Sequence, residues 1–284
     1  MKSLLLIITL IASFLSFSQE KSPYKIYDSK GKQVTYAKML KSLLEKDIVL
    51  FGEEHNCAIA HWLQLELTKD IDNKKDLILG AEMLEADNQE QVNSYLAGTM
   101  DAKELDSTAR LWSNHETDYA PLLNYARDQD LEFTATNIPR KYARVVHKNG
   151  GLTALDSISD LEKSWIAPLP IKFDSELPQY KAILDMMGEH GTPELVMAQA
   201  IKDATMAHFI LKTYKEGQFF LHFNGSFHSN FYEGILWYLK DQSPDLNYGT
   251  ISTVTQENID RLEKENRGKA DFIICVDEDM TTTY

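Results

Sequence analysis

The sequence predicts an α/β protein with a central, mainly parallel sheet flanked by helices. Short apolar runs rich in β-branched and aromatic residues alternate along the chain with longer stretches of helical spacing, which is typical of this fold class. The apolar runs contain few alternating polar residues, as expected for strands that helices cover on both faces. The chain has 284 residues, 43% of them hydrophobic and 25% charged, which is the composition of a folded globular protein. Its length allows one large domain.

Six strands and a helical insertion are expected. The strands are residues 47–51, 77–81, 132–136, 219–223, 248–254 and 272–276, and the helical stretches between them are 58–70, 87–97, 102–112, 119–130 and 140–148. Residues 151–217 contain no strand pattern. Ser159 begins a capping-box pattern there, residues 166–178 form a proline-rich loop, and residues 193–214 have the spacing of one long helix after Gly191 and Thr192.

The N-terminal residues predict an export signal. Lys2 precedes the apolar run 4–15, and small residues follow at Ser16 and Ser18. The run is shorter than the roughly twenty apolar residues that a membrane-spanning helix needs. No cysteine follows it, so a lipoprotein anchor is not supported. We therefore expect residues 1–18 to be a signal peptide, residues 19–284 to be a single α/β domain, and the protein to be periplasmic, secreted or on the cell surface.

The net charge limits which partners are expected, and the cysteine count limits which disulfide bonds are expected. The net charge is −14, and no run of five basic residues occurs, so nucleic acid is excluded as an expected partner. Cys57 and Cys275 are too few to define a disulfide framework. Two free thiols, at least one of them buried, are expected, and a disulfide between them is the alternative.

Polar side chains follow four of the predicted strands. Strand 47–51 leads into the segment Gly52-Glu53-Glu54-His55, and strand 77–81 leads into Glu82. Strand 132–136 leads into Asn137, and strand 219–223 leads into the segment Asn224-Gly225-Ser226-Phe227-His228. The carboxyl ends of parallel strands meet at one edge of a sheet and form the crevice that holds ligands. These side chains are therefore expected to gather at a single site.

Two of these segments share the pattern Gly-x-x-His. Glycine lets the backbone leave a strand with positive φ or pass close to a ligand, so both imidazoles would lie over one crevice. With Glu82, and with Glu53 or Glu54, they suit a divalent transition metal or a general acid and base. The alternative makes Glu53 a helix-start residue and His228 a helix cap. His222, inside a strand, is expected to be a buried, hydrogen-bonded histidine.

Several separated motifs resemble the ChaN-like haem-binding uptake family of the Tiki superfamily. They are the segment from Ile48 to His55, His61-Trp62-Leu63-Gln64, the segment from Gly80 to Glu85, Thr136-Asn137-Ile138-Pro139-Arg140, the segment from Gln199 to Ala207, and Asn224-Gly225-Ser226-Phe227-His228. They occur in the same order as in the family, and the resemblance spans about residues 46–276.

The resemblance implies an exported protein that binds haem and assists haem or iron uptake, and so a haem-binding protein rather than an enzyme. Haem is then the favoured cofactor, and an outer-membrane haem receptor is a candidate partner. The resemblance leaves open a homodimer that seals an apolar haem surface. No iron ligand is assigned. Arg140 is a candidate for pairing with propionates, and Met197 and Met206 are candidates for contacting haem in the helical insertion.

The wider superfamily also contains metal-dependent proteases with paired Gly-x-x-His motifs. For that alternative, a metal-dependent hydrolase, the matching metal ligands are His55, Glu82 and His228, and Glu54 joins them as a candidate catalytic residue. A serine nucleophile is not supported, because the pattern Gly-x-Ser-x-Gly is absent around Ser226. A third alternative is a binding module that retains the fold without using the crevice.

Overall fold

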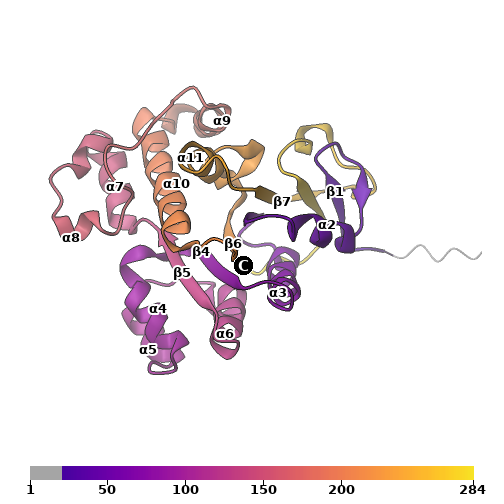
Figure 1. Ribbon diagram of the computed structural model, residues 1–284. Helices are drawn as coiled ribbons and strands as arrows, with labels where there is room; N and C mark the ends of the chain where they lie inside the picture. The colour runs from indigo at the N-terminus through magenta and orange to yellow at the C-terminus, as the bar shows by residue number, and fades with distance from the viewer. Residues whose placement is uncertain (1–20) are drawn as a thin grey trace, which may run out of the picture.

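The computed structural model describes residues 21–284, and the predicted signal peptide lies outside the described residues. In the described part of the chain, eight strands form one sheet in the order β2-β1-β8-β7-β3-β6-β4-β5 (Figure 1). The strands are β1 (Tyr24–Asp28), β2 (Gln33–Val34), β3 (Ile48–Glu53), β4 (Leu77–Glu85), β5 (Glu132–Asn137), β6 (Phe219–Gly225), β7 (Tyr248–Gln256) and β8 (Phe272–Asp277). The strands from β8 to β5 are parallel to their neighbours, and β1 pairs antiparallel with both β2 and β8.

The helices occupy both faces of this sheet (Figure 1). They are α2 (Tyr36–Leu43), α3 (Ala58–Asp72), α4 (Gln89–Leu96), α5 (Ala102–Thr108), α6 (Ala120–Asp128), α7 (Arg140–Lys148), α8 (Asp160–Lys163), α9 (Pro178–Met187), α10 (Pro193–Thr213) and α11 (Ile235–Gln242). One core cluster joins the sheet to α2, α3, α4, α5 and α6. A second cluster joins the opposite face to α7, α10 and α11. The α/β fold with a mainly parallel sheet is therefore confirmed.

The six predicted strands are all present, and four of them extend to include site residues. β3 reaches Glu53, β4 reaches Glu85, β5 reaches Asn137 and β6 reaches Gly225. The helical insertion contains α8, α9 and α10 and no strand within residues 151–217. The predicted capping box at Ser159 is present, since its hydroxyl accepts from the backbone N–H of Glu162 while Glu162 accepts from the backbone of Ser159.

The sequence patterns missed β1, β2, α2 and α9. β1 and β2 lie at the edge of the sheet and are only partly buried, so they lack the continuous apolar run of a central strand. α9 begins at Pro178, in the last position of the predicted loop, because proline is well tolerated in the first turn of a helix. Cys57 and Cys275 are free and buried, as expected. Between residues 21 and 284, no helix has the length and apolar character needed to cross a bilayer.

Candidate functional site

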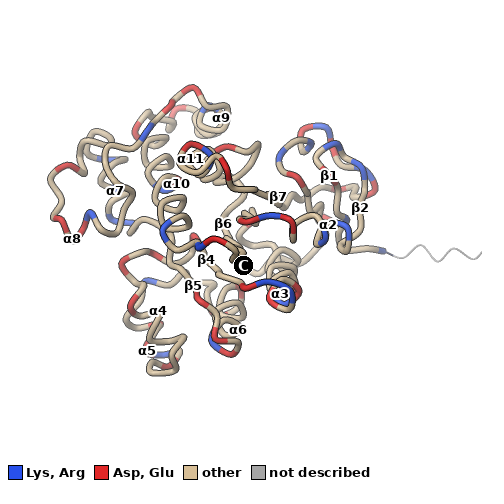
Figure 2. Tube along the Cα trace, in the orientation of Figure 1, with Lys and Arg blue, Asp and Glu red and all other residues tan. Residues whose placement is uncertain are grey.

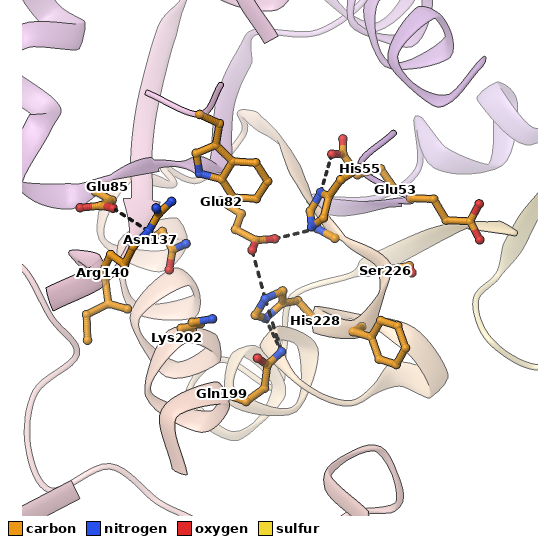
Figure 3. A pocket seen from close by; sticks show the side chains of 15 residues that line it. Glu53, His55, Glu82, Glu85, Asn137, Arg140, Gln199, Lys202, Ser226 and His228 are labelled. Carbon is orange, nitrogen blue, oxygen red and sulfur yellow. Dashed lines mark hydrogen bonds and ion pairs between the residues drawn. The ribbon is translucent and has the colours of Figure 1, made fainter. Parts of the chain in front are cut away.

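A cavity of about 510 Å³ opens at the carboxyl edge of the sheet, where β3, β4, β5 and β6 end (Figure 3). Its walls combine acidic, basic, amide and aromatic side chains. The lining residues are Glu53, Glu54, His55, Glu82, Glu85, Trp112, Asn137, Ile138, Arg140, Gln199, Lys202, Gly225, Ser226, Phe227 and His228. All four predicted strand ends contribute to it, so the expectation of a single crevice agrees with the structure.

His55 is held by a buried carboxylate at the end of β3. Nδ1 of His55 donates to Oε1 of Glu53 at 2.9 Å, and Glu53 is 1% exposed. Two further donors hold the same carboxylate: the hydroxyl of Tyr119 at 2.8 Å and the amide of Gln64 at 2.6 Å. With Nδ1 as the donor, the remaining ring nitrogen, Nε2, is the one that can bind a ligand.

His228 is held in the same way from the opposite side. Its Nδ1 donates to Oδ1 of Asp203 at 2.5 Å, and Asp203 is fully buried in α10. The hydroxyl of Tyr180, on α9, donates to the other oxygen of Asp203 at 3.1 Å. Each histidine of the two Gly-x-x-His segments thus belongs to a tyrosine–carboxylate–imidazole arm. The two arms come from different parts of the chain.

Glu82 lies between the two imidazoles (Figure 3). Its Oε1 is 3.2 Å from Nε2 of His228, and its Oε2 accepts from the backbone N–H of Gly225 at 2.7 Å. The pairing of β4 with β5 is irregular between Ala81 and Glu85. Such irregularities re-aim side chains, and here Glu82 lies within one and points into the cavity.

The charges of this group are coupled. Burial disfavours the charged form of His228, but the carboxylates of Glu82 and Asp203 outweigh it and raise its pKa to about 9. For Glu82, the two imidazoles and the backbone donor outweigh burial and lower the pKa of the carboxyl. For His55, burial is outweighed by the hydrogen bond to Glu53 and by the charges of Glu82 and Glu53, so its pKa is also raised. At neutral pH the structure therefore holds an imidazolium–carboxylate pair.

The glycines of the two Gly-x-x-His segments, Gly52 and Gly225, are needed because a side chain would not fit there, and not because the backbone has positive φ. Neither Gly52 nor Gly225 is among the positive-φ residues of the described chain. A Cβ atom at Gly225 would lie 2.8 Å from both Cε1 and Nε2 of His55, a distance that real contacts do not reach. The close approach that we expected toward a ligand is thus an approach to the histidine ring itself.

The remaining predicted residues fall into two groups. Glu54 and Arg140 line the cavity. Met206 is fully buried in the second core cluster, Met197 packs partly buried against the same cluster, and neither lines the cavity. A methionine at helical spacing on α10 faces the core, which is why these two candidates for haem contact are not at this site. His222 is fully buried between Thr136 and Asn224, as expected.

The sequence patterns missed several residues of the cavity wall and of the two arms. Asp203, Gln199 and Lys202 come from α10, and Trp112 and Tyr119 come from the segment around a π-helix at His115–Tyr119. None of these residues directly follows a strand, so a pattern of polar residues at strand ends does not identify them. The segment Gln199–Ala207 gave one signal, because a buried Asp203 on an apolar helix requires a partner.

No three His, Cys, Asp or Glu side chains within residues 21–284 are arranged as a ready-made metal site. His228 contacts Glu82 directly instead. The donor set nevertheless has the chemistry of a transition-metal site, because both imidazoles are oriented by carboxylates through Nδ1, as metal-binding histidines usually are.

The family model described as haem-binding uptake, Tiki superfamily, ChaN, matches residues 39–239. The chain belongs to this family. The match includes β3, β4, β5 and β6, the insertion with α10, and therefore every residue of the two arms.

Solved structures with the same fold include ChaN. The structure described as cofacial haem binding to ChaN of Campylobacter jejuni has a TM-score of 0.68 and 18% identity, covering 90% of this chain and 98% of that one. A Bacillus cereus protein has a TM-score of 0.53 and 11% identity, covering 95% and 97%. At these identities the likeness shows the fold alone.

Among curated proteins, the chloroplastic protein RETICULATA-RELATED 5 of Arabidopsis thaliana is 27% identical over 223 residues, or 70% of this chain. This chain spans 30% of the length of that relative.

Proposed function

We propose that this protein binds haem in the cavity at the carboxyl edge of its sheet and assists haem or iron uptake outside the cytoplasm. The composition of the cavity carries the proposal. Apolar surface from Trp112, Ile138 and Phe227 stands beside the cationic groups of Arg140 and Lys202. Haem has the matching chemistry, since it is a flat apolar macrocycle with two carboxylate groups.

The residues present fit haem. Phe227 is 46% exposed although it is a large apolar side chain, and an exposed aromatic beside a cavity is typical of a ligand-binding wall. The side chain of His55 is 35% exposed, and Glu53 fixes its ring. Bound haem would supply an iron that accepts His, Met, Cys or Tyr as axial ligand, and the protein supplies the apolar walls and the cations. Membership of a family named for haem uptake supports the proposal.

Export is part of the proposal. Lys2, the apolar run 4–15 and the small residues Ser16 and Ser18 support a cleaved signal. Haem capture outside the cytoplasm needs such placement. Mass spectrometry of the protein purified from a culture fraction tests it, because a mature chain that starts near Gln19 is expected and an intact N-terminus would contradict it.

A haemin titration tests the haem proposal. Residues 19–284 are titrated with haemin, and absorbance is followed in the Soret region. A saturable, shifted band at a fixed ratio is expected, and its position identifies the axial ligand class. A spectrum that never departs from free haemin would overturn the proposal.

A second candidate, metal-dependent hydrolysis, is favoured by the convergence of the two arms on Glu82. His55, His228 and Glu82 would hold a divalent transition metal, with Glu53 and Asp203 orienting the imidazoles. When bound, the metal would activate water. Metal entry requires His228 to lose its proton and to separate from Glu82, with which it is now in contact. Glu54, at the cavity wall, is then available as a base.

Elemental analysis of the protein as isolated decides between the candidates. A stoichiometric divalent metal with no saturable haemin binding would favour the hydrolase. Haemin binding in a metal-free protein would favour uptake.

A further inference from the structure

We propose that the cavity contains an anion subsite, formed by Arg140, Lys202 and Asn137, that takes a carboxylate or phosphate group of the ligand. The inference rests on the proposed function insofar as this cavity binds a ligand, and it adds the chemical group by which the ligand is held. In Figure 3 these residues lie on the opposite side of the cavity from Glu53 and His55.

The first observation is the N-terminus of α7. The helix starts at Arg140, directly after Asn137, Ile138 and Pro139 leave β5, and its first turn contains no acidic residue. A helix N-terminus carries a partial positive charge and attracts anions. The first two residues of α7, Arg140 and Lys141, are both basic.

The second observation is the amide of Asn137. Its side chain is 9% exposed and lines the cavity, and Oδ1 finds no hydrogen-bond partner among the described residues. A buried polar atom without a partner is destabilising, so such atoms usually have a hydrogen-bond partner. The other end of the same amide, Nδ2, also makes no hydrogen bond to the described residues, and its N–H group can donate to an anionic oxygen in the cavity.

The third observation is the charge balance around Arg140. Its nearest carboxylate, Glu85, is 3.9 Å away and 4% exposed. Glu85 is already paired with Nε of Arg110 at 2.8 Å. The side chain of Arg140 is 66% exposed, which leaves its planar guanidinium fork available to a carboxylate or phosphate.

The fourth observation is Lys202. It lies on α10 beside Asp203 and lines the same cavity. Across residues 21–284 it forms no ion pair within 4.0 Å. The chain as a whole is acidic, with a net charge of −14, and Figure 2 shows Lys and Arg residues interspersed with Asp and Glu along the described chain. In this acidic molecule, Arg140 and Lys202 lie together on one side of the cavity (Figure 3).

The subsite and His55 lie on opposite sides of one cavity (Figure 3), so the ligand should have an anionic group at a distance from the group that reaches His55. A porphyrin with propionates has this layout. A peptide or ester that ends in a carboxylate has it too, and so the subsite applies under either candidate function.

Haemin and haemin dimethyl ester test the subsite, since the ester lacks both anionic charges. The variant R140Q/K202Q is compared with R144Q/K212Q, which removes equal charge from exposed positions on the same two helices. We expect wild type and R144Q/K212Q to bind haemin roughly tenfold or more tighter than the ester, and R140Q/K202Q to lose that preference. Equal binding of haemin and ester by wild type would overturn the subsite.

Inorganic phosphate separates failure of the subsite from failure of the proposed function. If wild type binds no haemin, phosphate binding is measured by isothermal titration calorimetry. Saturable binding that R140Q/K202Q and N137D lose, and that R144Q/K212Q retains, supports the subsite without haem. N137D is nearly isosteric and places a negative charge beside the anion. If wild type binds neither haemin nor phosphate, the proposed subsite is wrong.

Discussion

Nε2 of His228 lies 3.2 Å from Oε1 of Glu82, and both side chains are buried. Glu82 lies within β4 and His228 lies three residues after the end of β6, and these two strands are neighbours in the sheet. Their contact joins the two histidine arms into one group, because Glu82 also raises the pKa of His55 by its charge. The chemistry of the cavity therefore depends on this carboxylate.

Glu82→Gln should remove the electrostatic coupling between Glu82 and the two histidines, His55 and His228. The variant keeps the shape of the side chain but removes the charge that opposes burial of the imidazolium, so the pKa of His228 should fall well below about 9. Proton NMR titration of the imidazole resonances measures it. A His228 that still titrates near 9 in the variant would show that Asp203 alone sustains the charge.

Asp203→Asn should weaken any divalent metal site by roughly 10–100-fold, because the carboxylate that orients His228 through Nδ1 is lost. Dialysis against Zn²⁺ followed by elemental analysis measures the change. Asp185→Asn, at an exposed position on α9, removes the same charge far from the cavity and serves as the control. Equal zinc retention by both variants would contradict a role for Asp203 in metal binding.

His55→Ala together with His228→Ala should abolish metal binding if the crevice is a metal site. Haem binding should weaken in the same double variant if haem binds in the proposed cavity, which both histidines line, and should persist if haem lies against the helical insertion. Elemental analysis measures metal binding, and the haemin titration measures haem binding. Stoichiometric metal retained by the double variant would defeat the assignment of the metal ligands.

Gly225→Ala should displace His55, since the added Cβ would lie 2.8 Å from the imidazole ring. We expect a loss of about 1–3 kcal/mol in the free energy of unfolding, the usual cost of overpacking a tight site. Urea denaturation measures it. The same substitution at Gly249, where the nearest atom is a flexible Lys46 carbon at 3.1 Å, should cost less. Equal losses at both glycines would argue against the contact with His55.

The metal-free protein should be most stable near pH 6.5. Burial lowers the pKa of His222 to about 4, so the folded state resists a proton that the unfolded chain binds below 6.5. Stability from His222 is thus lost as pH falls from 6.5 toward 4. For His228 the folded pKa is raised to about 9, so its contribution is present below 6.5 and is lost as pH rises through 9.

His222 and His228 each contribute at most roughly 3.5 kcal/mol to this profile, since one pKa unit corresponds to about 1.4 kcal/mol. Urea denaturation in the presence of a chelator between pH 4.5 and 9 measures the profile. His222→Gln should flatten the acid limb and leave the alkaline limb. An acid limb that survives in this variant would assign the loss to other groups, among them Glu82.

The sequence by itself determined the α/β class, all six central strands and the edge of the sheet where the polar side chains gather. Continuous apolar runs report burial on both faces, and the residues directly after them are placed at the carboxyl edge by strand geometry alone. His55, Glu82 and His228 follow from that pattern. Export, by contrast, stays a prediction, because residues 1–18 lie outside the described chain.

Only the tertiary structure decided which side chains complete the site. Asp203 and Lys202 come from a long helix of the insertion, and Tyr119 comes from the segment beside α6, so no local periodicity relates them to the strand ends. The tertiary packing also placed Met206 in the core, because helical spacing alone does not say which face of α10 meets the sheet. Glu53 lies two residues before His55, but the carboxylate that holds His228 comes from Asp203 on α10, and this contact depends on packing that local sequence patterns do not encode.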